Sequence, residues 1–179
     1  MKVFGFIGPS GSGKTTLIEK LIPIFTGLGL RVSVIKHTHH DFDVDRPRKD
    51  SWRQRQAGAL EVLLTSDRRW VLMHELRGAP EPDLPNQLAH LSPCDLVMVE
   101  GFKRQPIPKL EVWRAANDTQ LLQPTDATIV AIAADIKLDV GVPVFGLDQK
   151  TAMAQFILGH LGMRRTEATA PAWRERQLP

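Results

Sequence analysis

The sequence contains little cysteine and no long apolar run, and each absence excludes a class of protein. Among its 179 residues there is one cysteine, Cys94. A single thiol excludes an internal disulfide framework, and it excludes a zinc site built from four cysteines or from two cysteines and two histidines. The apolar run at residues 3–7 is too short for a signal peptide or a membrane span. We therefore expect a cytoplasmic protein with no membrane partner.

Internal repeats, low-complexity tracts and a strong excess of one charge are also missing. The chain has 23 Lys and Arg residues against 20 Asp and Glu residues, a formal net charge of +3. With 42% hydrophobic residues it can bury a core, so we expect a globular chain rather than a disordered one. A basic cluster at residues 46–55 either meets phosphates or forms a solvated surface, and we expect no nucleic-acid partner.

Apolar periodicity predicts strands and helices in alternation. A strand at 3–7, a helix from 15 to about 28 and a strand at 31–36 form one unit in which a helix joins two parallel strands. A hairpin is expected from strands at 61–65 and 70–73, and further strands are expected at 96–99, 129–133 and 142–147. Three further helices are expected: one at 50–58, a short one that ends near residue 91, and one at 148–161. This order predicts an α/β sandwich of three layers, with a mostly parallel sheet and an added antiparallel hairpin, over residues 1–163. Residues 164–179 lack apolar periodicity, and we expect them to be a mobile tail.

Residues 8–15 read Gly-Pro-Ser-Gly-Ser-Gly-Lys-Thr, which is the spacing of a phosphate-binding loop. Small residues let successive backbone N–H groups bind phosphate oxygens at the positive end of a helix dipole. Lys14 would place its charge on the outer phosphates, and Thr15 is the expected ligand of Mg²⁺. A glycine-rich turn without an anion does not explain a cation at the start of a helix. The sequence therefore predicts a P-loop NTPase fold that binds a nucleoside triphosphate through Gly8, Gly11, Ser12, Gly13, Lys14, Thr15 and Thr16.

Several carboxylates follow predicted strands or lie in the loop after the second strand. Glu100 ends an apolar strand, where nucleotide hydrolases keep a carboxylate near magnesium, and the alternative is a surface glutamate. Among Asp41, Asp43 and Asp45 we favour Asp45 as a further group near Mg²⁺. Asp135 follows the strand at 129–133, where it would either accept hydrogen bonds from the N1–H and 2-amino groups of guanine or cap a turn.

The same loop contains three histidines within four positions. His37, His39 and His40 could form a transition-metal site with the neighbouring aspartates, or they could belong to a polar loop that faces the phosphates.

Lys14 and Glu100 are the residues that we expect to act in hydrolysis. The sequence offers no clear base to activate water, because Glu100 is expected to be engaged with the metal, so hydrolysis should be slow.

The chain resembles the molybdopterin-guanine dinucleotide biosynthesis protein B family over roughly residues 3–160. The resemblance rests on five stretches, and the first is Gly-Ser-Gly-Lys-Thr-Thr at 11–16. The others are Ile-Lys-His-Thr-His-His-Asp at 35–41 with Asp-Val-Asp at 43–45, Lys-Asp-Ser at 49–51, Gly-Ala at 58–59 and Val-Glu-Gly-Phe-Lys at 99–103.

This resemblance implies a GTP-binding accessory protein of molybdenum cofactor biosynthesis, with weak Mg²⁺-dependent GTPase activity. It implies a homodimer that acts beside the guanylyltransferase which joins GMP to molybdopterin, but not the transfer itself. Residues 11–16 would hold the phosphates, Thr15, Asp45 and Glu100 would organise magnesium, and Asp135 would face the base. Ala134 stands where family members often have Thr or Ser, which leaves ATP as a competitor of GTP. From their charge, the basic residues Lys103, Arg104 and Lys109 near Glu100 could meet either a phosphorylated pterin or only water.

Two other functions fit the same motifs. A small-molecule kinase would use Asp43 or Asp45 as a base for an acceptor hydroxyl, with Arg46 or Arg48 neutralising the transferred phosphate. A metal-delivery GTPase would bind its cargo through the histidines at 37–40. Phosphate transfer to a metabolite would identify the kinase, and loss of metal affinity in a triple alanine variant of the histidines would identify the delivery protein.

Overall fold

The computed structural model describes residues 1–38 and 42–163, and within them the chain forms two compact units. One unit comprises Met1–His37 with Gln87–Pro179, and the other comprises Thr38–Asn86. The predictions made for His39, His40, Asp41 and the tail at 164–179 lie outside the described residues. No helix within the described ranges is long and apolar enough to cross a membrane.

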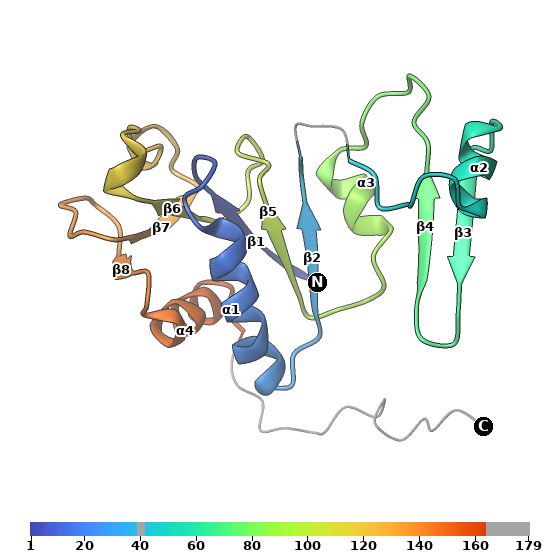
Figure 1. Cartoon of the computed structure of the whole chain (residues 1–179). Helices are drawn as coiled ribbons and strands as arrows, with labels where there is room; N and C mark the ends of the chain where they lie inside the picture. Colours follow the sequence, from blue (N-terminus) through green and yellow to red (C-terminus); the bar gives the residue numbers. More distant parts are fainter. Residues whose placement is uncertain (39–41, 164–179) are drawn as a thin grey trace. The chain divides into compact units, whose positions relative to one another are not determined.

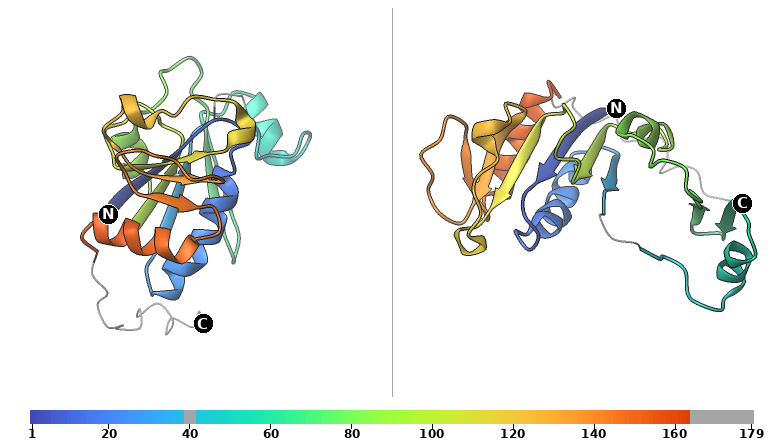
Figure 2. Two further views of the ribbon diagram at one scale, coloured as in Figure 1. Left: turned by 90° about the vertical axis from the view of Figure 1, so that its left-hand side faces the viewer. Right: turned by 90° about the horizontal axis from the view of Figure 1, so that it is seen from above.

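A six-stranded sheet forms the centre of the first unit (Figure 1). Its strands lie in the order β2-β5-β1-β6-β7-β8, and each neighbouring pair is parallel. The view from above shows them in a row (Figure 2). Their bounds are β1 Lys2–Ile7, β2 Val32–Lys36, β5 Leu96–Glu100, β6 Lys109–Trp113, β7 Ile129–Ala134 and β8 Val144–Gly146. Because the strands are parallel, all their carboxyl ends meet at one edge, where α/β folds bind ligands.

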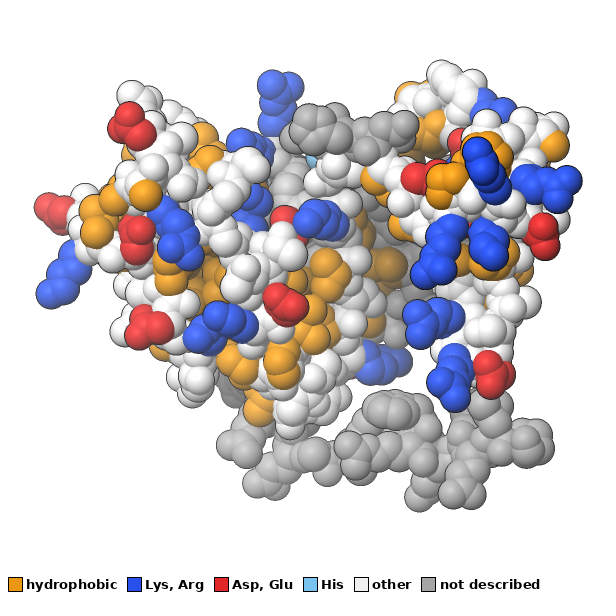
Figure 3. Space-filling view, in the orientation of Figure 1, with side chains coloured by type: hydrophobic (Ala, Val, Ile, Leu, Met, Phe, Trp, Pro, Cys, Tyr) orange, Lys and Arg blue, Asp and Glu red, His pale blue; other side chains and the backbone are white. Residues whose placement is uncertain are grey.

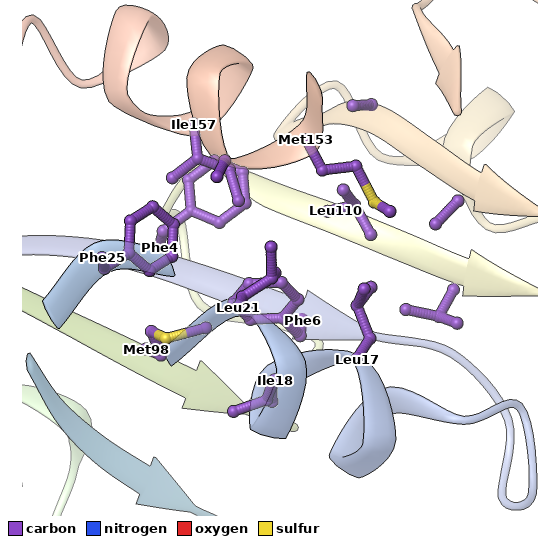
Figure 4. Packing of buried hydrophobic residues seen from close by; sticks show 14 of the residues in the cluster. Phe4, Phe6, Leu17, Ile18, Leu21, Phe25, Met98, Leu110, Met153 and Ile157 are labelled. Carbon is purple, nitrogen blue, oxygen red and sulfur yellow. The ribbon is translucent and has the colours of Figure 1, made fainter. Parts of the chain in front are cut away.

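Two helices, α1 (Lys14–Gly27) and α4 (Lys150–His160), cover one face of this sheet. Phe4 and Phe6 of β1 point from the sheet into the same apolar cluster as Leu21 and Phe25 of α1 and Ile157 of α4 (Figure 4). All five side chains are fully buried, and each such burial contributes about 1.5–3 kcal/mol to folding. The alternation of side chains along β1 therefore fixes which face of the strand meets the helices.

Irregular segments cover the opposite face, and β6 binds them through two buried charged side chains. Side chains alternate along a strand, so Lys109 and Glu111 point away from the helical face that receives Leu110 and Val112. The Lys109 ammonium donates to the backbone oxygens of residues 103 and 105, while the Glu111 carboxylate accepts from the backbone N–H groups of residues 122 and 123. Short 3₁₀ turns at Ala115–Asn117 and Gln123–Thr125 belong to these segments.

The second unit is built on a two-stranded antiparallel sheet with one short helix. Strands β3 (Glu61–Thr65) and β4 (Trp70–His74) pair directly, and α2 (Asp50–Gln56) precedes them. Helix α3 (Leu84–Ala89) spans the boundary with the first unit along the chain. Lys and Arg side chains gather over the region of α2, β3 and β4 in the space-filling view (Figure 3).

The structure confirms the predicted α/β fold with its mostly parallel sheet and separate antiparallel hairpin. The prediction omitted β6, which lies beside β1 in the sheet. This strand reads Lys-Leu-Glu-Val-Trp, and its charged residues hid a position that is buried on both faces. The omission matters because β6 leads into part of the candidate site.

Candidate functional site

The loop between β1 and α1 has the backbone conformation of a phosphate-binding loop. Gly8 and Gly13 have φ angles of 143° and 97°, a region that side chains with a Cβ rarely adopt. A Cβ on Gly8 would lie 2.2 Å from the backbone oxygen of Val112 in β6. Glycine at position 8 is therefore required both by its φ angle and by the close approach of β6.

The first turn of α1 presents unpaired backbone donors at the carboxyl edge of the sheet. All residues of α1 are described, and its first turn has no side-chain cap and no acidic residue. The N–H groups of such a turn and the helix dipole favour an anion. The Lys14 ammonium bends back over the loop and donates to the backbone oxygens of Gly8 at 3.0 Å and Pro9 at 2.7 Å. Burial lowers the pKa of Lys14, and although Glu100 opposes this effect, nearby Lys103 and Lys36 reinforce it.

Thr15 and Glu100, which are 85 positions apart in the sequence, meet directly at this edge. The Thr15 hydroxyl donates to Glu100 Oε1 at 2.8 Å, and the glutamate side chain is about nine-tenths buried. The pair supplies one hydroxyl and one carboxylate, and Mg²⁺ prefers oxygen ligands of this kind while keeping several waters. These two residues therefore fit a magnesium ion that also binds phosphate oxygens.

Lys36 joins this pair, although the sequence analysis did not single it out as a site residue. Its ammonium donates to Thr15 Oγ1 at 3.3 Å and lies 3.5 Å from Glu100 Oε1. The strand register explains the contact, because Lys36 is directly opposite Glu100 in the pairing of β2 with β5. The sequence signal that could have identified Lys36 is a lysine at the carboxyl end of a predicted strand, at the same edge of the sheet as the phosphate loop.

Residues that follow β6 connect the phosphate loop to Asp135. The Arg114 guanidinium donates through Nε to the Ser12 backbone oxygen at 2.9 Å, and Asn117 donates to the Ser10 backbone oxygen at 3.4 Å. The Ala115 backbone N–H donates to Asp135 Oδ1 at 3.0 Å. Arg114 and Asn117 were not predicted as site residues because β6 was not predicted. Asp135 was predicted either to accept from guanine or to cap a turn, and its contact with the Ala115 backbone N–H was not foreseen.

Asp45 lies in the second unit, where its carboxylate accepts several hydrogen bonds. Asp45 Oδ1 accepts from the Ser51 hydroxyl at 2.8 Å, and Oδ2 lies 3.4 Å from Arg55 Nε. Arg55 also pairs with Asp43 at 2.8 Å and Glu75 at 2.7 Å. The hydrogen bond to Glu75, followed by that to Asp43, raises the pKa of Arg55. In the second unit Asp45 thus belongs to an ionic network centred on Arg55.

The histidine loop is described only in part. The His37 backbone N–H donates to the Glu100 backbone oxygen at 2.9 Å, and the His37 ring lies 4.8 Å from the Phe102 ring, centre to centre. Residues 1–38 and 42–163 contain no group of three or more His, Cys, Asp or Glu that could hold a metal ion. The proposed roles of His39 and His40 fall outside these ranges.

Lys109 is buried, although its charge predicted that it would meet either a phosphorylated pterin or water. Only 1% of the residue is exposed, and its ammonium donates to Asp126 Oδ2 at 3.0 Å besides the two backbone oxygens of the loop after Glu100. Desolvation at a buried position requires such partners for a charged group. Lys109 therefore supports the loop that follows Glu100 rather than offering a free charge.

Comparison with known sequences gives a consistent set of relatives. A family model described as molybdopterin guanine dinucleotide synthesis protein B matches residues 3–135. The chain is 41% identical over 155 residues to a molybdopterin-guanine dinucleotide biosynthesis adapter protein from Haemophilus influenzae, covering 87% of this chain and 86% of that protein. It is 39% identical over 160 residues to the protein of the same name from Escherichia coli K12, covering 87% and 91%.

The fold is also similar to solved structures of MobB proteins. A crystal structure of a MobB protein homologue from Bacillus stearothermophilus superposes with a TM-score of 0.68 at 26% identity, covering 92% of this chain and all of that chain. A crystal structure of molybdopterin-guanine biosynthesis protein B superposes with a TM-score of 0.71 at 28% identity, covering 88% and 99%.

Proposed function

The chain belongs to the molybdopterin guanine dinucleotide synthesis protein B family, and on that premise we propose that it is a GTP-binding adapter protein of molybdenum cofactor biosynthesis. Its curated relatives are molybdopterin-guanine dinucleotide biosynthesis adapter proteins, which supports a role in this pathway. The observation that carries the nucleotide part of the proposal is the phosphate loop, with its open helix start and the adjoining Thr15–Glu100 pair.

In this proposal each residue of the site has a defined task. The backbone N–H groups of residues 11–16 bind phosphate oxygens, and Lys14 supplies charge to the outer phosphates. Thr15 and Glu100 hold Mg²⁺, which supplies neutralisation of the phosphate charge when bound. Asp135 accepts from guanine, and Ala134 beside it makes ATP the competing nucleotide to test.

Slow hydrolysis is part of the proposal. Glu100 Oε1 accepts from Thr15 and lies near Lys36, so this carboxylate is engaged and is a poor base for water. An oriented water without a strong base or an arginine supplied by a partner reacts slowly. We therefore assign the main effect to the bound nucleotide, which would prepare the protein to act in the cytoplasm on the guanylyltransferase and a phosphorylated pterin.

The second unit supports a homodimer. Its sheet has two strands, and a two-stranded sheet is at best marginally stable alone in water. Leu63, Trp70 and Leu72 share one face and are 60%, 63% and 45% exposed. A second copy of the chain, which carries the same apolar face, is the partner that we propose covers this sheet.

Nucleotide binding by Lys14→Ala tests the proposal directly. We expect the variant to lose nearly all affinity for GTP in the presence of Mg²⁺, measured by titration calorimetry, because it loses the ammonium that lies over the loop. Lys20→Ala, which removes an exposed lysine of the same helix, is the matched control and should bind like the wild type. Circular dichroism would confirm that both variants are folded. If Lys14→Ala binds GTP within a few-fold of the wild type, the site assignment is wrong.

A further inference from the structure

Two lysines reach the phosphate site from different strands, and only Lys14 belongs to the phosphate-loop motif. The Lys14 ammonium lies over the loop, held by the backbone oxygens of residues 8 and 9. Lys36 is at the end of β2, which pairs with β5, and its ammonium meets Thr15 and Glu100. The two ammonium groups therefore reach the site from two different elements, α1 and β2.

We propose that Lys36 binds the outermost phosphate of the nucleotide, so that it distinguishes a triphosphate from a diphosphate. This inference rests on the proposed GTP binding. In the P-loop arrangement the magnesium ligands lie beside the outer phosphates, and Lys36 contacts both residues that fit magnesium in this chain. Its side chain is 56% exposed, so the ammonium has room to move between these groups and a phosphate oxygen.

The charges around Glu100 support this assignment. Glu100 carries one negative charge, and Lys14, Lys36 and Lys103 lie close enough to one another that Lys36 and Lys103 both disfavour the charged form of Lys14. Lys103 also interacts with Glu111, so three ammonium groups face two carboxylates, which still leaves an excess of positive charge. A triphosphate supplies the missing negative charge, and it supplies more of it than a diphosphate does.

Magnesium binding would strengthen the effect. Lys36 and Mg²⁺ would both seek Thr15 Oγ1 and Glu100 Oε1, and two cations at the same oxygens repel each other. The ammonium is the more mobile of the two because it ends a flexible side chain. Lys36 would therefore transfer from Glu100 to a phosphate oxygen when magnesium and the triphosphate bind.

Lys36 lies close to the boundary between the two units along the chain. Lys36 is the last residue of β2, and the second unit begins two residues later at Thr38. The intervening His37 holds its backbone N–H on the Glu100 backbone oxygen and packs its ring against Phe102. The residue that reads the outer phosphate is thus placed at the point where the chain leaves the nucleotide-binding unit.

The test compares two nucleotides in the same variants. Affinities for a non-hydrolysable GTP analogue and for GDP, each with Mg²⁺, would be measured by calorimetry for the wild type, Lys36→Gln, Lys36→Arg and the control Lys20→Ala. One hydrogen bond between charged groups is expected to change binding by about 10- to 100-fold. Lys36→Gln should therefore lose about that factor for the GTP analogue and less than about threefold for GDP, while Lys36→Arg should keep most of the preference.

The possible outcomes separate this inference from the proposed function. Equal losses for both nucleotides, or no loss for either, would overturn the role of Lys36 while leaving GTP binding intact. A wild-type protein that binds neither nucleotide would overturn the proposed function and this inference together. Circular dichroism and thermal unfolding of Lys36→Gln would show that a selective loss is not caused by unfolding.

Discussion

The two units of the chain are held together by different kinds of interaction. The first unit buries a continuous apolar cluster, in which Phe4, Leu21 and Phe25 have no exposed surface. In the second unit Arg55 binds three carboxylates, while large apolar side chains of the sheet remain exposed. The difference indicates that the first unit is stabilised by its own apolar core, whereas the second unit relies on a polar network.

Removing a core side chain from the first unit should have the largest effect on stability. Phe25 of α1 is fully buried, and replacing phenylalanine by alanine at such a position costs about 3–5 kcal/mol because a cavity remains. We expect Phe25→Ala to lose this amount in urea unfolding. The neighbouring exposed Thr26→Ala should change the free energy of unfolding by less than about 0.5 kcal/mol. Similar small losses in both variants would contradict the described core.

Removing Arg55 should loosen the second unit and leave the first unchanged. Arg55→Met leaves the carboxylate of Asp45, whose side chain is 8% exposed, without its guanidinium partner. We expect several-fold faster hydrogen exchange of backbone amides in β3 and β4, and unchanged exchange in β1, β5 and β7. Arg53→Met, on the exposed side of the same helix, serves as the control. Faster exchange throughout both units would refute the view that the network is local.

The exposed face of β3 and β4 should control self-association. Trp70→Ser removes the most exposed large apolar side chain of this face, and we expect the dimer to dissociate about tenfold or more readily. Sedimentation velocity over a concentration series would measure the change, with Arg69→Ser as the control. A wild-type chain that sediments as a monomer at all concentrations would rule out the proposed dimer.

The smallest expected effect concerns the buried charge on β6. Burial raises the pKa of Glu111, although the backbone N–H groups of Leu122 and Gln123 partly offset this effect. The folded chain therefore binds this proton more tightly than the unfolded chain, and the contribution of Glu111 to stability falls as pH rises through the two pKa values. The free energy of unfolding of the wild type minus that of Glu111→Gln should decrease from about pH 4 to pH 7. A difference that grows over this range would show that the hydrogen bonds outweigh burial.

Local sequence patterns predicted most of the fold and singled out the phosphate loop, Thr15 and Glu100. Continuous apolar runs located the buried strands β5 and β7, and the glycine spacing located the phosphate loop. Strand β6 was not predicted, because the partners that allow Lys109 and Glu111 to be buried lie at residues 103–126 and no local pattern reveals them. Lys36 and Arg114 reach the site only through the strand order, so their roles depend on contacts between distant segments.

The attachments of the phosphate loop affect how fast a ligand can bind. Arg114 and Asn117 hold the loop's backbone oxygens from one side, and Gly8 rests against the carbonyl of Val112. A loop ordered in this way loses little conformational entropy on binding, because its shape is set by the scaffold. Association should accordingly proceed at the rate of diffusional encounter steered by charge, without a slow folding step of the loop.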